Sequence, residues 1–99
     1  MALSDANIQD GVNVTAVDGD KVKTRYTMNF VEGGHDLVYR FIPDNTVWID
    51  AHLDESQWPH VIKHELEERA RMAKGESYDE AHPKANKVEK KGRQADETR

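Results

Sequence analysis

Five consecutive residues, His64-Glu65-Leu66-Glu67-Glu68, have the side chains and the spacing of half a metal site. His64 and Glu68 are four residues apart, which places them on one face of a helix, where both side chains can reach a single ion. Glu65 borders that face, at the position of a general base that would deprotonate a metal-bound water. The segment therefore predicts His64 and Glu68 as metal ligands and Glu65 as a catalytic residue.

A catalytic zinc site usually takes three protein ligands and leaves one position for water, so a third ligand must come from elsewhere in the chain. His82 and Glu89 are the two candidates, because they are seven residues apart and on the same side of a second predicted helix. The chain contains no cysteine, which excludes thiolate ligands and disulfide bonds. The predicted cofactor is therefore Zn²⁺ held by imidazole and carboxylate groups.

The helix that carries the motif is predicted from its apolar period and its end signals. Pro59 is favoured in a first helical turn, and Gly75 is a standard helix stop. The apolar stripe is expected to pack on the core, which turns His64 and Glu68 toward the opposite face. The stripe consists of Trp58, Ile62, Leu66, Ala70 and Ala73.

A second helix is predicted to begin at the capping box formed by Ser77 and Glu80. Pro83 removes one backbone hydrogen bond, so a kink or a fresh start is expected there. The apolar members of this helix are Tyr78, Ala81, Ala85 and Val88.

The first half of the chain predicts β-strands. Residues 12–17 alternate apolar and polar side chains, the Asp18-Gly19 pair indicates a hairpin turn, and residues 21–31 alternate again. Residues 35–42 and 46–53 predict two further strands. The predicted fold class is α+β, a short antiparallel meander of three or four strands followed by two C-terminal helices.

One domain is expected from a chain of 99 residues, of which 36% are hydrophobic and 33% charged. We expect a flexible N-terminus over residues 1–10, a single α+β domain over residues 11–90 and a disordered charged tail over residues 91–99.

The net charge of −5 argues against a nucleic-acid partner. The chain has neither a long apolar run nor a signal-peptide pattern, so we expect no membrane partner and a cytoplasmic location, in the host cell if the protein is phage-encoded. A peptide or protein partner is compatible with this composition, and the sequence does not specify an oligomeric state.

The segment N-T-V-W-I-D-A-H-L, a short loop and W-P-H-V-I-K-H-E-L-E-E resemble the strand, loop and active-site helix of zincin-type metallopeptidases over residues 46–72. H-E-L-x-E followed by Y-x-x-A-H-x-x-A-x-x-x-E also resembles small proteins of phages and their bacterial hosts. The resemblance implies a minimal metal-binding domain in which His64 and Glu68 occupy ligand positions and Glu65 the position of the base. Glu68 stands where the usual motif has a second histidine.

Three functions follow from these patterns. The first is a small zincin-like metalloprotein, extending to a minimal metal-dependent hydrolase. The second is a non-enzymatic phage accessory protein that binds a host or virion protein through its acidic sheet face or charged helices. The third is structural, with His82 and Glu89 contacting Glu68 or Arg69 to fix the angle between the helices.

The remaining histidines are predicted to be outside the site. His60 extends the row of His64 and Glu68 by one turn, in a position typical of a solvated surface. His35 is interpreted as a turn residue after Gly33-Gly34, and His52 as a residue at a strand end.

Overall fold

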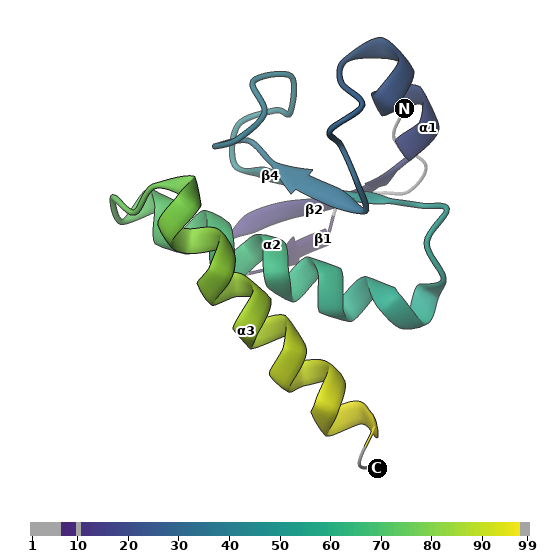
Figure 1. Cartoon of the computed structure of the whole chain (residues 1–99). Helices are drawn as coiled ribbons and strands as arrows, with labels where there is room; N and C mark the ends of the chain where they lie inside the picture. The colour runs from purple at the N-terminus through teal and green to yellow at the C-terminus, as the bar shows by residue number, and fades with distance from the viewer. Residues whose placement is uncertain (1–6, 10, 98–99) are drawn as a thin grey trace.

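A small mixed sheet and two long C-terminal helices make up the architecture of the chain (Figure 1). The computed structural model describes residues 7–9 and 11–97, so the flexibility predicted for residues 1–6 and 10 lies outside the described residues. The α+β class and the two C-terminal helices are confirmed. The elements are β1 (Asn7–Gln9), β2 (Val12–Val17), α1 (Gly19–Arg25), β3 (Gly33–His35), β4 (Thr46–Asp50), a 3₁₀ turn η1 (Glu55–Gln57), α2 (Trp58–Ala73) and α3 (Tyr78–Glu97).

The sheet is mixed rather than antiparallel throughout. Its order is β1-β2-β4-β3, with β2 and β4 parallel at the centre and β1 and β3 antiparallel at the edges. A parallel central pair needs a crossover, and the chain between β2 and β4 supplies it. All five residues of β4 are buried, as expected for a strand covered on both faces.

The Asp18-Gly19 pair begins a helix instead of a hairpin turn. The Asp18 carboxylate accepts hydrogen bonds from the backbone N–H groups of Asp20 and Lys21 and so caps α1. Gly19 donates its N–H to Asp50 Oδ1, and a Cβ on Gly19 would lie 2.3 Å from the Asp50 carboxylate. Asp18 therefore caps α1, and Gly19 allows the start of α1 to lie close to β4. The predicted strand over residues 21–31 is wrong, because α1 occupies residues 19–25.

The predicted strand over residues 35–42 is also wrong beyond its first residue. β3 ends at His35, and the backbone N–H groups of Val38 and Tyr39 both donate to the carbonyl of His35. The chain therefore turns back immediately after β3. The strand predicted over residues 46–53 is present as β4, which ends at Asp50.

Two apolar clusters cover the two faces of the sheet, as the alternation of side chains along β4 requires. Val47 and Ile49 face α2, whereas Trp48 faces the side of α1. On the α2 side the buried cluster is Val12, Val14, Val47, Ile49 and Val61. On the other side it is Val17, Val22, Phe30, Ile42 and Trp48.

The two C-terminal helices begin and end near their predicted boundaries. α2 runs from Trp58 to Ala73 before Gly75, which adopts a positive φ of 110°. At the start of α3, the backbone N–H of Glu80 donates to Ser77 Oγ and the N–H of Ser77 donates to the Glu80 carboxylate, as a capping box requires.

α3 is continuous through Pro83, so the fresh start considered there does not occur. It also continues through residues 91–97, which were predicted to be disordered, while residues 98 and 99 lie outside the described residues. Among the described residues, no helix combines the length and the apolar character that crossing a bilayer requires.

Candidate metal centre

α2 buries its polar face. His64, Glu65 and Glu68 are 6%, 8% and 3% exposed, whereas Ile62 and Leu66 of the apolar stripe are only half-buried. The two faces are opposite, as predicted, and Trp58, Ile62 and Leu66 pack against the sheet cluster, but the polar face is buried more deeply than the apolar stripe. Ionisable groups are rarely buried in this number without a partner or a functional role.

α3 and β3 cover the polar face of α2. Ala81 and Ala85 are both 0% exposed, and their small side chains allow α3 to pack closely against α2. From the same helix, His82 reaches Glu68 and Glu89 reaches His64. The predicted residues of the two helices are therefore brought together.

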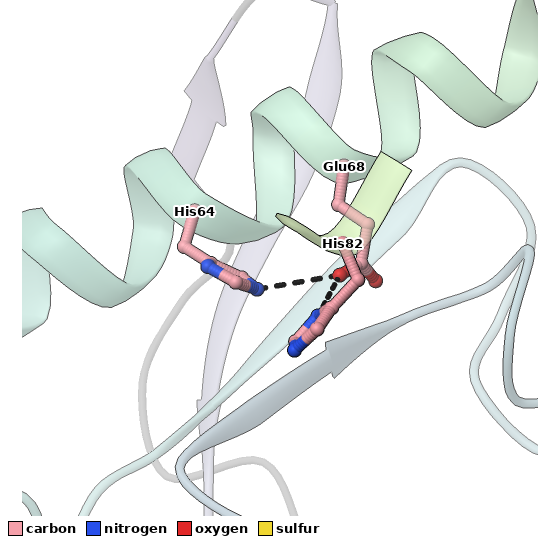
Figure 2. A group of neighbouring side chains, drawn as sticks. All are labelled: His64, Glu68 and His82. Carbon is pink, nitrogen blue, oxygen red and sulfur yellow. Dashed lines mark hydrogen bonds and ion pairs between the residues drawn. The ribbon is translucent and has the colours of Figure 1, made fainter. Parts of the chain in front are cut away.

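Three side chains converge on one point between α2 and α3 (Figure 2). Glu68 Oε2 lies 3.3 Å from His64 Nε2 and 2.7 Å from His82 Nδ1. Donor atoms at about 2.0–2.2 Å from a tetrahedral Zn²⁺ stand about 3.3–3.6 Å apart. The first distance already fits, and the second needs to lengthen by about 0.7 Å, a small movement for the His82 side chain, which is 38% exposed.

His35 orients the Glu68 carboxylate from the opposite side. The backbone N–H of Leu37 donates to His35 Nδ1, so Nε2 carries the ring proton and donates to Glu68 Oε1 at 2.8 Å. His35 is 0% exposed. One carboxylate oxygen is thus held by β3, which leaves Oε2 to face His64 and His82. Metal-binding side chains are commonly fixed by such outer hydrogen bonds.

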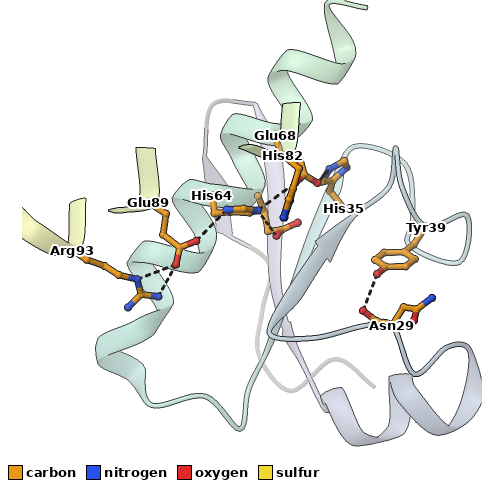
Figure 3. Close-up of polar contacts among 9 residues, drawn as sticks. Asn29, His35, Tyr39, His64, Glu68, His82, Glu89 and Arg93 are labelled. Carbon is orange, nitrogen blue, oxygen red and sulfur yellow. Dashed lines mark hydrogen bonds and ion pairs between the residues drawn. The ribbon is translucent and has the colours of Figure 1, made fainter. Parts of the chain in front are cut away.

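Glu89 lies on the side of His64 that faces away from Glu68 (Figure 3). Its Oε1 is 3.1 Å from His64 Nδ1, while its Oε2 accepts from Arg93 Nε at 2.9 Å. The contact with Nδ1 lacks the alignment of a hydrogen bond, and this buried nitrogen has no hydrogen-bond partner among the described residues. Of the two candidates for the third ligand, His82 is therefore the one that faces Nε2 and Glu68, and Glu89 is placed to orient the His64 ring.

Glu65 sits beside the three converging residues with little compensation for its charge. Its Oε2 lies 3.8 Å from His64 Nε2. Burial and, after it, the negative charge of Glu68 raise the pKa of Glu65 to about 8. A carboxyl group with this pKa is suited to exchanging a proton near neutral pH.

The hydrogen bonds around Glu68 keep its charge. Burial acts to raise the pKa of Glu68, but hydrogen bonds with His35, His64 and His82 outweigh it and hold that pKa well below its ordinary value. Burial likewise acts to lower the pKa of His64, but the hydrogen bond with Glu68 and the nearby carboxylates raise it. Glu68 is therefore the anionic centre of the cluster.

A pocket of about 330 Å³ opens onto this cluster. Its charged lining is acidic, since Glu32, Glu65, Glu68 and Glu89 line it and none of its described lining residues is Lys or Arg. Glu32 has a φ of 64°, in the left-handed region that costs a non-glycine residue free energy. The negative charge and the imidazole groups together favour a cation in the pocket.

Two tyrosines complete the pocket wall. The ring of Tyr78 stacks on His82 with centroids 5.0 Å apart, which limits the orientations of that imidazole. Tyr39 donates its hydroxyl hydrogen bond to the carbonyl of Asn29, and burial together with the charges of Glu65 and Glu68 raises the pKa of Tyr39. Tyr39 therefore stays protonated and can serve as a hydrogen-bond donor.

The sequence did not identify His35 as a residue of the site. The Gly33-Gly34 pair before His35 is the feature of the sequence that could have indicated it. A Cβ on Gly33 would lie 2.8 Å from the carbonyl oxygen of Trp48 and 3.2 Å from Val61 Cγ1. Glycine thus allows β3 to lie close against β4 and α2, which carries His35 to Glu68.

The other histidines take no part in the centre. His52 lies 3.0 Å from Asp18 and 3.9 Å from Asp20, in an exposed group at the start of α1. Among the described residues, the ligand-type atoms that converge between α2 and α3 do not include those of His60. Comparison of the chain with protein-family models, curated proteins and solved structures gave no match.

Proposed function

We propose that the protein is a small zincin-like metal-binding protein that holds Zn²⁺ through His64 Nε2, Glu68 Oε2 and His82 Nδ1. The observation that carries this proposal is the convergence of two imidazoles and one carboxylate in a pocket whose charged lining residues include four carboxylates. Among the described residues that line the pocket, the charged groups are carboxylates and titratable imidazoles, so a bound cation reduces the repulsion between the carboxylates.

The donor set favours zinc over the hard cations. Ca²⁺ and Mg²⁺ take six or more oxygen donors or several waters, whereas two imidazoles and one carboxylate match a zinc site with one position left for water. His35 would support such a site, because its hydrogen bond fixes the orientation of Glu68, and Glu89 lies 3.1 Å from His64 Nδ1 on the other side.

The proposal extends to a minimal metal-dependent hydrolase. A bound zinc would lower the pKa of a coordinated water toward neutrality, and Glu65, whose Oε2 lies 3.8 Å from His64 Nε2, would accept the proton of that water when its carboxyl group is ionised. A pocket of about 330 Å³ suits a short peptide segment better than a large ligand. The resemblance to small phage proteins and the expected cytoplasmic location belong to the same proposal.

Elemental analysis of protein purified without a histidine tag tests metal binding. We expect one zinc per chain, loss of that zinc in His64→Ala and in His82→Ala, and retention in the control His60→Ala, which removes an imidazole one turn away. Zinc at a hundred times its dissociation constant should stabilise the wild type by about 2.7 kcal/mol. A metal-free wild type that zinc does not stabilise refutes the proposal.

Glu65→Gln separates catalysis from binding. The variant should keep its zinc and lose hydrolysis of a mixed peptide substrate, whereas Glu67→Gln, which changes a neighbouring carboxylate of the same helix, should keep both. Equal peptide hydrolysis by wild type and Glu65→Gln contradicts the hydrolase but leaves the metal site standing.

The structural function is the second candidate, and the 2.7 Å contact between His82 and Glu68 favours it. In that case the cluster only fixes α3 on α2. Glu68→Gln would then lower the free energy of unfolding without any change in zinc content, and zinc would not alter the stability of the wild type.

A further inference from the structure

Polar contacts connect the second half of α3 to the start of α2. Between Val88 and the exposed Ala95, no residue of α3 has an apolar side chain. A helix end of this kind buries little apolar surface, and helix propensity alone rarely holds so short a segment in water. Contacts made by Arg93 therefore contribute to the helical structure of a segment whose composition is typical of disorder.

Arg93 joins two residues that belong to different helices. Its Nε donates to Glu89 Oε2 at 2.9 Å, and its Nη2 lies 2.8 Å from the same oxygen (Figure 3). Its Nη1 donates to Gln57 Oε1. Gln57 stands at the N-cap position of α2, but its side chain makes no capping hydrogen bond. The side chain of Gln57 instead receives α3, so Arg93 connects Glu89 to the first turn of α2.

Glu89 continues these contacts to the candidate metal centre. Its other oxygen, Oε1, lies 3.1 Å from His64 Nδ1, a buried nitrogen that has no hydrogen-bond partner among the described residues. A buried polar atom without a partner is rare in a folded protein and requires an explanation. The side chain of Glu89 is only 22% exposed. Glu89 Oε1 is therefore positioned to accept a proton carried by Nδ1.

A metal ion on His64 Nε2 would complete that hydrogen bond. A neutral imidazole carries one proton, and coordination through Nε2 places this proton on Nδ1. Without a metal the proton can lie on Nε2 instead, where Glu68 Oε2 is 3.3 Å away. Metal binding removes that alternative, so the ion and Glu89 favour the same form of His64.

We propose that Glu89, Arg93 and Gln57 are positioning residues for His64, and that metal binding in turn fixes the second half of α3 on the start of α2. This inference rests on the proposed metal site. Coupling between two binding events is reciprocal, so contacts that favour the metal-binding form of His64 are strengthened by the metal to the same extent. The empty and the loaded protein should therefore differ at residues 90–95, although none of these described residues lines the pocket.

Zinc affinity, measured by competition with a chromogenic chelator, tests the positioning role. Glu89→Gln should raise the zinc dissociation constant by about 10- to 100-fold, as expected for the outer partner of a ligating histidine. Gln57→Ala should raise it by about 2- to 10-fold, and it separates positioning from ligation because Gln57 contacts Arg93 and not the centre. The control Lys91→Ala removes an exposed charge from the same part of α3 and should leave the constant unchanged.

Backbone amide hydrogen exchange tests the effect of the metal on α3. In the wild type, zinc should slow exchange at residues 90–95 by about the factor that Gln57→Ala costs in zinc affinity, because the coupling is reciprocal. The amides of α1, on the other face of the sheet, are the internal control for a general gain in stability. In Gln57→Ala the slowing at residues 90–95 should disappear. A contact that is only structural would protect these amides equally with and without zinc.

The outcomes distinguish this inference from the metal site on which it rests. Far-ultraviolet circular dichroism confirms that each variant is folded before its zinc affinity is compared. A wild type that binds no zinc overturns both the metal site and this inference. A wild type that binds zinc as tightly as Gln57→Ala and Glu89→Gln do, or whose exchange at residues 90–95 does not respond to zinc, overturns this inference alone.

Discussion

Replacing Glu65 by glutamine should stabilise the metal-free protein. Glu65 is 8% exposed, and burial and the charge of Glu68 raise its pKa from 4.5 to about 8. A carboxyl group whose pKa is raised on folding contributes full stability below its unfolded pKa and loses that contribution as the pH rises toward its folded pKa. Glutamine cannot ionise, so the variant avoids this loss.

The two pKa values set the size of the effect. Integrating the linkage from pKa 4.5 to about 8 gives a penalty for the wild type of about 3 kcal/mol at pH 7 and about 1 kcal/mol at pH 5. The buried amide of glutamine costs part of the gain, which leaves an expected stabilisation of about 1–3 kcal/mol at pH 7. The gain should shrink steadily between pH 7 and pH 4.

Urea unfolding in the presence of a chelator, followed by tryptophan fluorescence, measures this difference. Glu67→Gln is the matched control, since its side chain is 31% exposed and its removal should change the free energy of unfolding by less than about 1 kcal/mol. The pKa of Glu65 is not raised by burial if Glu65→Gln is no more stable than the wild type at pH 7. The same conclusion follows if the stability gained by the variant does not depend on pH.

Two further variants test the supports of the site. Asp36→Asn should lower the free energy of unfolding by about 1–3 kcal/mol at neutral pH, because the Asp36 carboxylate accepts from Arg69 Nε at 2.6 Å and both side chains are largely buried. Burial acts to raise the pKa of Asp36, but the hydrogen bonds and charge of Arg69 outweigh burial and lower that pKa. The stability difference between Asp36→Asn and wild type should therefore vanish in acid, where Asp36 is protonated. Urea unfolding midpoints measured as a function of pH test this. Gly33→Ala should lower the thermal midpoint of unfolding, because the added Cβ would lie 2.8 Å from the carbonyl oxygen of Trp48. The control Gly92→Ala should not lower it, because its Cβ would have no contact closer than 3.6 Å. An equal midpoint for Gly33→Ala and wild type would contradict the close packing of β3.

The helical half of the chain was predictable because its signals are local. Pro59, Gly75 and the Ser77-Glu80 capping box each act within one turn of a helix end, so they set the boundaries of α2 and α3 regardless of what packs on them. The pairing of His64 with Glu68 followed from helical spacing for the same reason.

The crossover between β2 and β4 was not predictable in the same way. Alternation over residues 21–31 indicates a strand only if one side of it is buried, but Met28 is 74% exposed and the capped helix α1 takes the first half of that segment. The position of His35 depends on β3 reaching α2 across the sheet, a contact 33 residues away in sequence from Glu68. Long-range contacts of this kind leave no periodic trace in the sequence.

The deep burial of the polar face of α2 bears directly on the proposed metal site. Helical periodicity identifies two opposite faces, but which one is buried is decided by α3 and β3, whose small residues Ala81, Ala85 and Gly33 bring them against the polar side. Burying three ionisable side chains in so small a domain costs free energy that a helix turned by half a revolution would avoid. A cation held by His64, Glu68 and His82 would offset that cost, which ties the burial of the polar face to the proposed metal site.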